Sequence, residues 1–120
     1  MVGWEILTTD EYGEWFLGQS ARDQVLIHSR VELLKRSGPN LSRPYADTLK
    51  GSKIKNLKEL RIKTMTHAFR IAYLFDEKRN GLLLIGGDKK GKVQNIFYKN
   101  LIADAERIYS RYLAKRKESK

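Results

Sequence analysis

The sequence predicts a small α+β protein in which two N-terminal helices and one C-terminal helix pack on a small, mainly antiparallel sheet. Three observations predict this fold class: helical periodicity near the N-terminus, strand alternation in the middle, and a long amphipathic segment at the end. A chain of 120 residues has the length of one domain. We expect this domain over residues 1–114, followed by a basic tail over 115–120 that frays.

The N-terminal region predicts one strand followed by two helices. Residues 4–8 are aromatic and β-branched, as in a short strand. Thr8 and a glutamate three residues later have the spacing of a capping box, which predicts a helix over 10–17. Ser20 repeats this start signal, and apolar residues then recur at helical spacing until Gly38 and the following proline end the second helix.

The middle of the chain predicts a long surface connection and then a three-stranded meander. Residues 38–56 show no periodicity and are rich in Gly, Pro, Asn, Ser and Lys, which is typical of a loop. Residues 59–64 and 69–75 alternate between apolar and other side chains, and each predicts a strand. Asn80-Gly81 is a turn signal, so 82–86 is expected to return as the next antiparallel strand.

The segment from Leu101 to Leu113 has apolar residues at helical spacing and predicts the last helix. The longest apolar run, residues 82–85, is far too short to span a membrane. The N-terminus lacks the cationic start and apolar run of a signal peptide. The absence of cysteine is consistent with a reducing compartment and excludes a zinc ribbon or a thiol nucleophile. We therefore expect a cytoplasmic protein.

The net charge of +10 is unevenly distributed along the sequence. Residues 1–34 carry two basic and six acidic side chains, whereas the remaining residues carry 22 basic and 8 acidic ones. Such asymmetry creates a directed field that attracts a phosphate backbone to one side of a molecule. A solvated, solubilising surface is the alternative interpretation of the same charge.

Basic side chains are expected to meet on one face of the sheet. Arg61 and Lys63 are two residues apart in one predicted strand, so they share a face, and Arg70 is in the neighbouring strand. Such a convergence of cations without nearby acids is costly unless an anion is usually present. The predicted ligand is therefore a polyanion.

The loop over residues 87–92 contains three lysines and two glycines. It lacks the spacing of a phosphate-binding NTPase loop, so we exclude an NTPase. Its glycines still permit close backbone approach to a phosphate. An ordinary solvated hairpin end is an equally good interpretation of the same loop. Tyr98, just after the loop, can stack on a base or belong to the core with its aromatic neighbour. His67 is a candidate for an RNA contact, whereas His28 is expected to be structural.

Several segments together resemble the RelE/HigB superfamily of bacterial type II toxins, and most closely its phage-derived, HigB-like branch. The resemblance covers nearly the whole chain and depends on the order and spacing of the motifs, since no single tetrapeptide is specific. The matching segments are Gly38-Pro39-Asn40-Leu41, the later Leu49-Lys50-Gly51, Lys58-Glu59-Leu60-Arg61, Arg70-Ile71-Ala72-Tyr73, Gly86-Gly87-Asp88-Lys89 and Phe97-Tyr98.

This resemblance implies a RelE-like fold and a ribosome-dependent endoribonuclease that cuts messenger RNA without a metal or other cofactor. It also implies a cognate antitoxin, of the helix-turn-helix type, that holds the toxin inactive. Such enzymes use the RNA 2′-hydroxyl as the nucleophile on the adjacent phosphate. The protein must deprotonate that hydroxyl, stabilise the phosphorane and protonate the leaving 5′-oxygen.

By the same resemblance, six residues are candidate catalytic groups. Arg61 and Lys63 resemble a basic pair for proton transfer and phosphate binding, and Arg70 resembles a phosphate-clamping arginine. Either Lys89 or Lys90 is in the place of a cation that stabilises the leaving group or transition state, and Tyr98 resembles a stacking or proton-handling tyrosine. The expected contacts with RNA phosphates are made by His67, Lys92 and Lys99.

Some HigB relatives have His and Asp in these places. Here Asp88 precedes the lysines and the C-terminal histidine is missing, so the resemblance assigns no general base. Two alternatives remain: a ParE-like inhibitor of DNA gyrase and a basic nucleic-acid-binding module without catalysis. The presence of Arg61, Arg70 and Tyr98 argues against the gyrase inhibitor, whose relatives generally lack this set.

Overall fold

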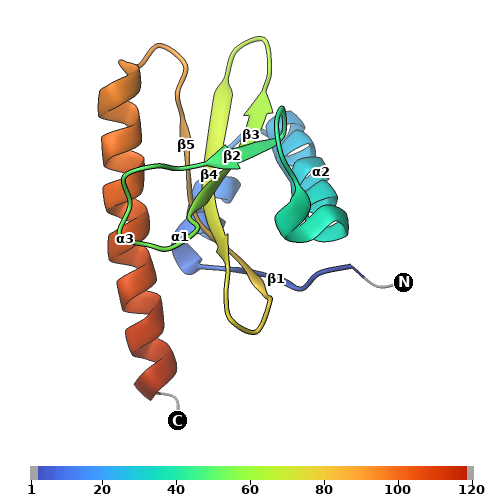
Figure 1. The fold of residues 1–120 in the computed structure, drawn as a ribbon. Helices are drawn as coiled ribbons and strands as arrows, with labels where there is room; N and C mark the ends of the chain where they lie inside the picture. The colour runs from blue at the N-terminus through green and yellow to red at the C-terminus, as the bar shows by residue number, and fades with distance from the viewer. Residues whose placement is uncertain (1–2, 119–120) are drawn as a thin grey trace.

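The computed structural model describes residues 3–118, which form a five-stranded sheet with helices on both faces (Figure 1). The strand order is β1-β5-β4-β3-β2, in which β1 runs parallel to β5 and the other neighbours are antiparallel. The predicted fold class, three helices on a mainly antiparallel sheet, is confirmed. The elements are β1 (Ile6–Thr8), α1 (Asp10–Leu17), α2 (Ala21–Ser37), the 3-10 turn η1 (Gly38–Asn40), β2 (Ala46–Thr48), β3 (Lys58–Lys63), β4 (Ala68–Phe75), β5 (Gly81–Asp88) and α3 (Gln94–Glu118).

The two N-terminal helices begin and end at local signals. Helix α2 begins as predicted, because the Ser20 hydroxyl accepts a hydrogen bond from the N–H of Asp23. The predicted capping box of α1 is wrong by one residue, since Thr9 rather than Thr8 accepts from the Tyr12 N–H. The Thr9 hydroxyl also donates to the carbonyl of Leu84, so a tertiary contact selects this cap.

Helix α2 ends at Gly38, whose φ of 63° lies in the left-handed region that favours glycine. A side chain at this position would also collide with the ring of Trp4, because an added Cβ would lie 2.2 Å from the indole Nε1. The glycine therefore serves both the helix end and the packing of the N-terminal segment against it.

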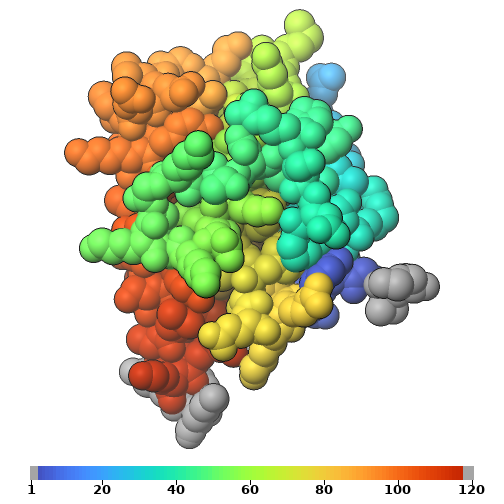
Figure 2. All heavy atoms as spheres, in the orientation of Figure 1, coloured from blue at the N-terminus to red at the C-terminus, as the bar shows by residue number. Residues whose placement is uncertain are grey.

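The expected loop over 38–56 contains the turn η1 and a strand that the sequence did not reveal. Residues 46–48 form the edge strand β2, which pairs with β3 in the register Ala46↔Leu60 and Asp47↔Glu59. Leu41 and Leu49 are buried, whereas Tyr45 is 41% exposed. In Figure 2 this segment covers the middle of the visible face, between α3 and α2.

Side chains of β3 and β4 divide between two cores because they alternate across the sheet. Leu60, Ile62, Phe69, Ile71 and Tyr73 join the core under α1 and α2. The other core lies under α3, which contributes Phe97, Leu101, Ala105 and Ile108 and meets Ala72 and Leu74 of the sheet. Val25 and Leu26, two of the apolar residues that recur at helical spacing in α2, are 68% and 42% exposed.

The alternation of β5 is interrupted by a register shift at Ala72/Tyr73 of its partner strand. Ala72 is opposite Ile85, whereas Tyr73 is opposite Leu83, so Leu84 is the extra residue of β5. Beyond this irregularity Gly87 is opposite Arg70, and Asp88 is opposite Phe69. The shift thereby determines which face of the sheet each residue near the loop over 87–92 occupies.

Helix α3 runs from Gln94 to Glu118, so part of the tail that was expected to fray is helical, and residues 119–120 lie outside the described residues. The domain boundary at residue 114 remains a prediction. Within residues 3–118, none of the helices has both the length and the apolar character of a transmembrane span.

Candidate functional site

Arg61 and Arg70 lie on the sheet face that α3 covers, directly opposite each other on β3 and β4. Alternation along both strands explains this position, since their neighbours Leu60 and Ile71 belong to the core on the other face. Arg70 is almost completely buried, with 4% of its surface exposed. Its Nη1 donates to the backbone carbonyl of Phe69 at 2.9 Å. The predicted convergence of these two arginines is therefore present in the structure.

A buried carboxylate, Glu59, lies beside both arginines. Its Oε2 is 3.2 Å from Arg61 Nη1, and its Oε1 is 3.6 Å from Arg70 Nε. Glu59 is only 3% exposed. Its Oε1 has no hydrogen-bond partner among the described residues. The sequence-based expectation of cations without a nearby acid was wrong, because Glu59 supplies the negative charge that allows the two guanidinium groups to be close.

Tyr98 reaches the same cluster from the first turns of α3. Its hydroxyl oxygen accepts a hydrogen bond from Arg70 Nε at 3.3 Å. Burial is the main reason why the pKa of Tyr98 is raised above its ordinary value, and the neighbouring Glu59 carboxylate adds to this effect. The phenol therefore remains protonated at neutral pH and can donate a hydrogen bond.

Lys89, the first residue after β5, is the lysine of the loop that joins the cluster. Its Nζ lies 5.8 Å from the centroid of the Tyr98 ring. Burial, followed by the positive charges of Arg70 and Arg61, lowers the pKa of Lys89 below its ordinary value. An ammonium group with a lowered pKa gives up its proton more readily than a surface lysine does.

These side chains line or underlie a cleft of about 350 Å³ between β2, β3 and the beginning of α3. Arg70 is buried beneath it and does not line it. At the rim, Arg43 and Asp47 form an ion pair with a nitrogen-to-oxygen distance of 2.7 Å. The lining residues are Arg43, Asp47, Thr48, Leu49, Lys50, Glu59, Arg61, Lys89, Gln94, Tyr98 and Ile102.

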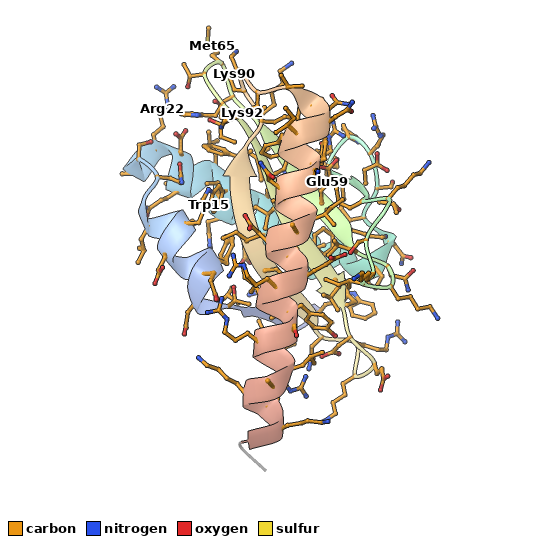
Figure 3. The ribbon with its side chains drawn as sticks, turned by 90° about the vertical axis from the view of Figure 1, so that its left-hand side faces the viewer. Trp15, Arg22, Glu59, Met65, Lys90 and Lys92 are labelled. Carbon is orange, nitrogen blue, oxygen red and sulfur yellow. The ribbon has the colours of Figure 1, made fainter. Side chains whose placement is uncertain are left out.

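The other predicted lysines lie outside this lining. Lys63 is exposed at the end of β3 and is close enough to contribute to the lowered pKa of Lys89. Lys90 and Lys92 lie near Met65 at one end of the molecule (Figure 3). Their Nζ atoms donate to backbone carbonyls, Lys90 to that of Met65 and Lys92 to that of Asp88. Lys99 is exposed on α3, one residue after Tyr98.

The two histidines lie away from the basic cleft. His67, expected to contact RNA, lies on the opposite face of the sheet, where its ring stacks on Phe69 and its Nδ1 is 2.5 Å from Asp88 Oδ2. His28, expected to be structural, has a side chain that is 67% exposed and lies 3.7 Å from Glu32. Neither imidazole reaches the basic cleft.

Sequence reasoning missed Glu59, Asp47 and Gln94 as members of the cleft. Glu59 shares its strand face with Arg61, so the alternation that identified the arginine also contained the signal for the carboxylate. Asp47 and Gln94 had no such signal, because β2 was not predicted and Gln94 occupies the cleft only through the placement of α3. Among residues 3–118, no group of three or more acidic or histidine side chains is arranged to hold a metal ion.

The family described as phage-derived protein Gp49-like (DUF891) matches residues 14–110 of the chain. The chain belongs to the Gp49-like family. Two Mycobacterium tuberculosis proteins of related sequence bear the names toxin HigB2 and toxin HigB3, and each is 31% identical to this chain. The HigB2 alignment covers 99% of this chain but only 59% of the relative, whereas the HigB3 alignment covers 91% and 93%.

The fold of this Gp49-like protein is similar to that of an arginine-to-alanine double mutant of Escherichia coli toxin RelE in the free state. The TM-score is 0.59 at 10% sequence identity, and the match covers 90% of this chain and 99% of RelE. At this identity the likeness concerns the fold alone. The family match and the HigB relatives confirm the predicted membership of the RelE/HigB superfamily, and the RelE structure confirms the predicted fold.

Proposed function

We propose that this protein is the toxin of a type II toxin–antitoxin system and that it is a ribosome-dependent endoribonuclease of messenger RNA. The observation that carries the proposal is the cleft in which Arg61, Lys89 and Tyr98 surround the buried Glu59. The toxin names of its HigB relatives support the same conclusion. It would act in the cytoplasm, where ribosomes and messenger RNA are found.

The proposed reaction is an attack of the RNA 2′-hydroxyl on the adjacent phosphate, without a metal ion. A bond forms between the 2′-oxygen and phosphorus, and the bond from phosphorus to the 5′-oxygen breaks. The products are a 2′,3′-cyclic phosphate and a 5′-hydroxyl. The protein must accept the proton of the 2′-hydroxyl, stabilise charge on the phosphorane and protonate the leaving oxygen.

The geometry supports a role for four of the groups that line the cleft. Glu59 is the carboxylate between the two arginines and its Oε1 makes no hydrogen bond to a described residue, so we assign it the proton from the 2′-hydroxyl. Arg61 has the planar, permanently charged group that binds phosphate oxygens. Lys89 has a lowered pKa, so we assign it the protonation of the leaving 5′-oxygen. Tyr98 offers a ring on which a base can stack.

Arg70 is better suited to hold the site than to bind RNA. Its guanidinium is already engaged by Glu59, by the Tyr98 hydroxyl and by a backbone carbonyl. We therefore propose that Arg70 orients Glu59 and Tyr98 from below, while the exposed Lys63, Lys90, Lys92 and Lys99 attract the RNA backbone from around the cleft.

A reconstituted translation reaction tests the proposal directly. We expect the wild-type protein to cut messenger RNA only when ribosomes are present, and to leave ends at codon-related positions. Arg61→Ala should reduce the rate by roughly 100-fold or more, as for other groups that stabilise transition-state charge. Arg36→Ala, which removes an exposed arginine from α2, is the matched control and should cleave at the wild-type rate.

Other outcomes would support the alternatives. Double-strand breaks in DNA with intact messenger RNA would indicate a gyrase inhibitor. Salt-sensitive RNA binding without cleavage would indicate a binding module.

The antitoxin, which we propose to be a helix-turn-helix protein as the family resemblance implies, should be encoded beside this gene. Co-expression of the two should abolish growth arrest, and a neighbouring protein that has no such effect would contradict that assignment.

A further inference from the structure

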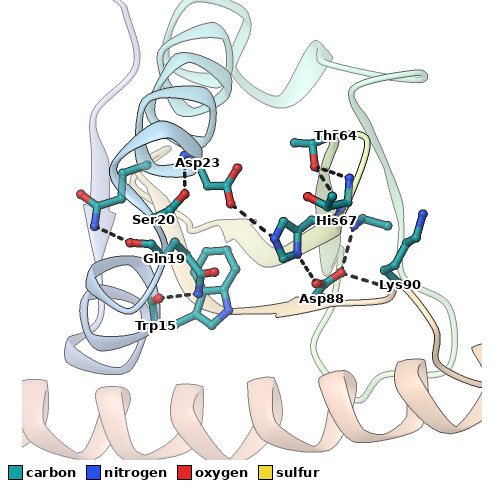
Figure 4. A network of polar contacts seen from close by, with 11 residues as sticks. Trp15, Gln19, Ser20, Asp23, Thr64, His67, Asp88 and Lys90 are labelled. Atoms are coloured by element: carbon teal, nitrogen blue, oxygen red, sulfur yellow. Dashed lines mark hydrogen bonds and ion pairs between the residues drawn. The ribbon is translucent and has the colours of Figure 1, made fainter.

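The sheet face opposite the basic cleft carries a histidine between two carboxylates. His67 Nδ1 is 2.5 Å from Asp88 Oδ2 at the end of β5, and His67 Nε2 is 3.5 Å from Asp23 Oδ2 on α2 (Figure 4). The ring also stacks on Phe69, with 4.7 Å between the two centroids. Three elements that are distant in sequence therefore meet at one imidazole.

The backbone of Asp23 and the carboxylate of Asp88 are themselves held in place. The N–H of Asp23 donates to the hydroxyl of Ser20, which caps α2. Asp88 Oδ1 accepts hydrogen bonds from the N–H groups of Ala68 at 2.9 Å and Lys90 at 3.0 Å. Burial on its own raises the pKa of Asp88, but the hydrogen bonds from His67 and from these two N–H groups bring it below its ordinary value. The carboxylate is therefore ionised throughout the physiological range.

The backbone position of the loop over residues 87–92 depends on these contacts. Asp88 accepts from the backbone of Lys90, and the carbonyl of Asp88 accepts from Lys92 Nζ at 3.1 Å. Lys89 lies between these anchored residues, and its own N–H donates to the carbonyl of Ala68 at 2.8 Å. Successive residues of an extended chain point to opposite faces, so Asp88 points toward His67 while Lys89 points toward Tyr98 and the cleft.

We propose that His67 and Asp88 form a positioning clamp that fixes Lys89 in the cleft from the other side of the sheet. This inference rests on the proposed nuclease function for its catalytic consequence but not for its structural one. His67 does not touch RNA in this arrangement, because the sheet separates it from the cleft. The clamp acts on Lys89 through the backbone of residues 88–90.

The structural consequence is tested on the free protein, without ribosomes. Amine acylation followed by mass spectrometry measures the reactivity of Lys89 relative to the exposed Lys78. In the wild type, Lys89 should react faster than Lys78 at pH 8, since its lowered pKa leaves more of the neutral amine. His67→Phe keeps an aromatic ring but loses both polar contacts, and it should abolish this difference. His67→Asn retains a donor near the position of Nδ1 and should restore it.

The catalytic consequence is tested in the translation reaction at single turnover. His67→Phe should lower the rate constant of cleavage by about tenfold or more, as expected when a catalytic group is displaced. The ribosome concentration at half-maximal rate should stay within about twofold, because no RNA contact is lost. His67→Asn should recover most of the rate, and His28→Gln, at the exposed histidine, should match the wild type. Asp88→Asn provides a second disruption if His67→Phe does not fold.

The two failures are distinguishable. Absence of cleavage by the wild type would overturn the proposed function. The acylation experiment would still test the clamp, because it needs no cleavage. An unchanged acylation ratio in folded His67→Phe and Asp88→Asn would overturn the clamp. A lower affinity for ribosomes with an unchanged rate constant would also overturn it, since that result would mean that His67 binds RNA.

Discussion

At the scale of single residues, the site depends on a carboxylate that holds together two buried or half-buried arginines. Glu59 and Arg70 are both at least 95% buried, so removing one of them leaves the other charge in a medium of low dielectric. Glu59→Ala should therefore lower the free energy of unfolding by about 3 kcal/mol or more. Urea denaturation followed by circular dichroism measures this loss.

A matched pair of variants separates this effect from ordinary surface electrostatics. Glu32→Ala removes a half-exposed partner of Lys35 and His28, and it should cost less than about 1 kcal/mol. Combining Glu59→Leu with Arg70→Met removes both buried charges, and it should recover most of the stability while remaining inactive in cleavage. If Glu59→Ala is no more harmful than Glu32→Ala, the buried ion pair does not hold the site.

For Lys89 we expect stability and activity to change in opposite directions when the side chain is replaced. Its folded-state pKa is lowered, first by burial and then by Arg70 and Arg61, so the charged form is less favourable in the folded than in the unfolded state. This unfavourable contribution is present at neutral pH and disappears as the pH rises through the lowered pKa toward about 10.4, the unfolded value. Lys89→Met should therefore raise the melting temperature at pH 7 and reduce cleavage.

The matched control for Lys89 is Lys78→Met, in the exposed turn at the other end of β4. It should change neither the melting temperature nor the rate of cleavage. Melting curves between pH 7 and pH 10 measure the effect, and the advantage of Lys89→Met over the wild type should shrink as the pH rises. A melting temperature below that of the wild type at pH 7 would contradict the assigned electrostatics.

At the scale of elements, the sequence predicted what depends on local periodicity and missed what depends on tertiary contacts. The alternation around Arg61 and Arg70 was sufficient to place both on one face, and the helices were found from their caps and apolar spacing. The strand β2 has only three residues and gains its pairing from β3, so its sequence has no independent signal. The register shift in β5 is equally non-local, yet it determines which faces Asp88 and Lys89 occupy.

The N-terminus of α1 shows how a tertiary contact overrides a local signal. Thr9 caps the helix through the Tyr12 N–H and donates to the Leu84 carbonyl at 2.6 Å, so it joins the helix to β5. Thr9→Ala removes both contacts and should cost about 2 kcal/mol. Thr9→Ser keeps the hydroxyl and should lose only a fraction of that, whereas Thr8→Ala should be nearly neutral. Equal losses for Thr8→Ala and Thr9→Ala in denaturant titrations would contradict this assignment.

At the scale of the whole molecule, the uneven distribution of charge along the sequence places acidic and basic residues on different faces of the sheet. The acidic N-terminal third forms β1, α1 and most of α2, and these two helices cover one face of the sheet. The basic remainder forms the strands and helix that surround the cleft on the other face. An approaching RNA is therefore attracted toward the cleft and not toward the helical layer of α1 and α2.

This asymmetry predicts how RNA affinity depends on salt. A single-stranded oligonucleotide with 2′-deoxy residues cannot be cut, so its binding can be followed by fluorescence anisotropy at equilibrium. If about four phosphates contact Arg61, Lys63, Lys89 and one further lysine, the logarithm of the association constant should fall with that of salt with a slope near −3. Lys63→Met should reduce the slope by about 0.7, whereas Lys78→Met should leave it unchanged. Equal reductions from both substitutions would mean that RNA binds to basic side chains across the whole surface. That result would contradict the assignment of the cleft as the RNA-binding site.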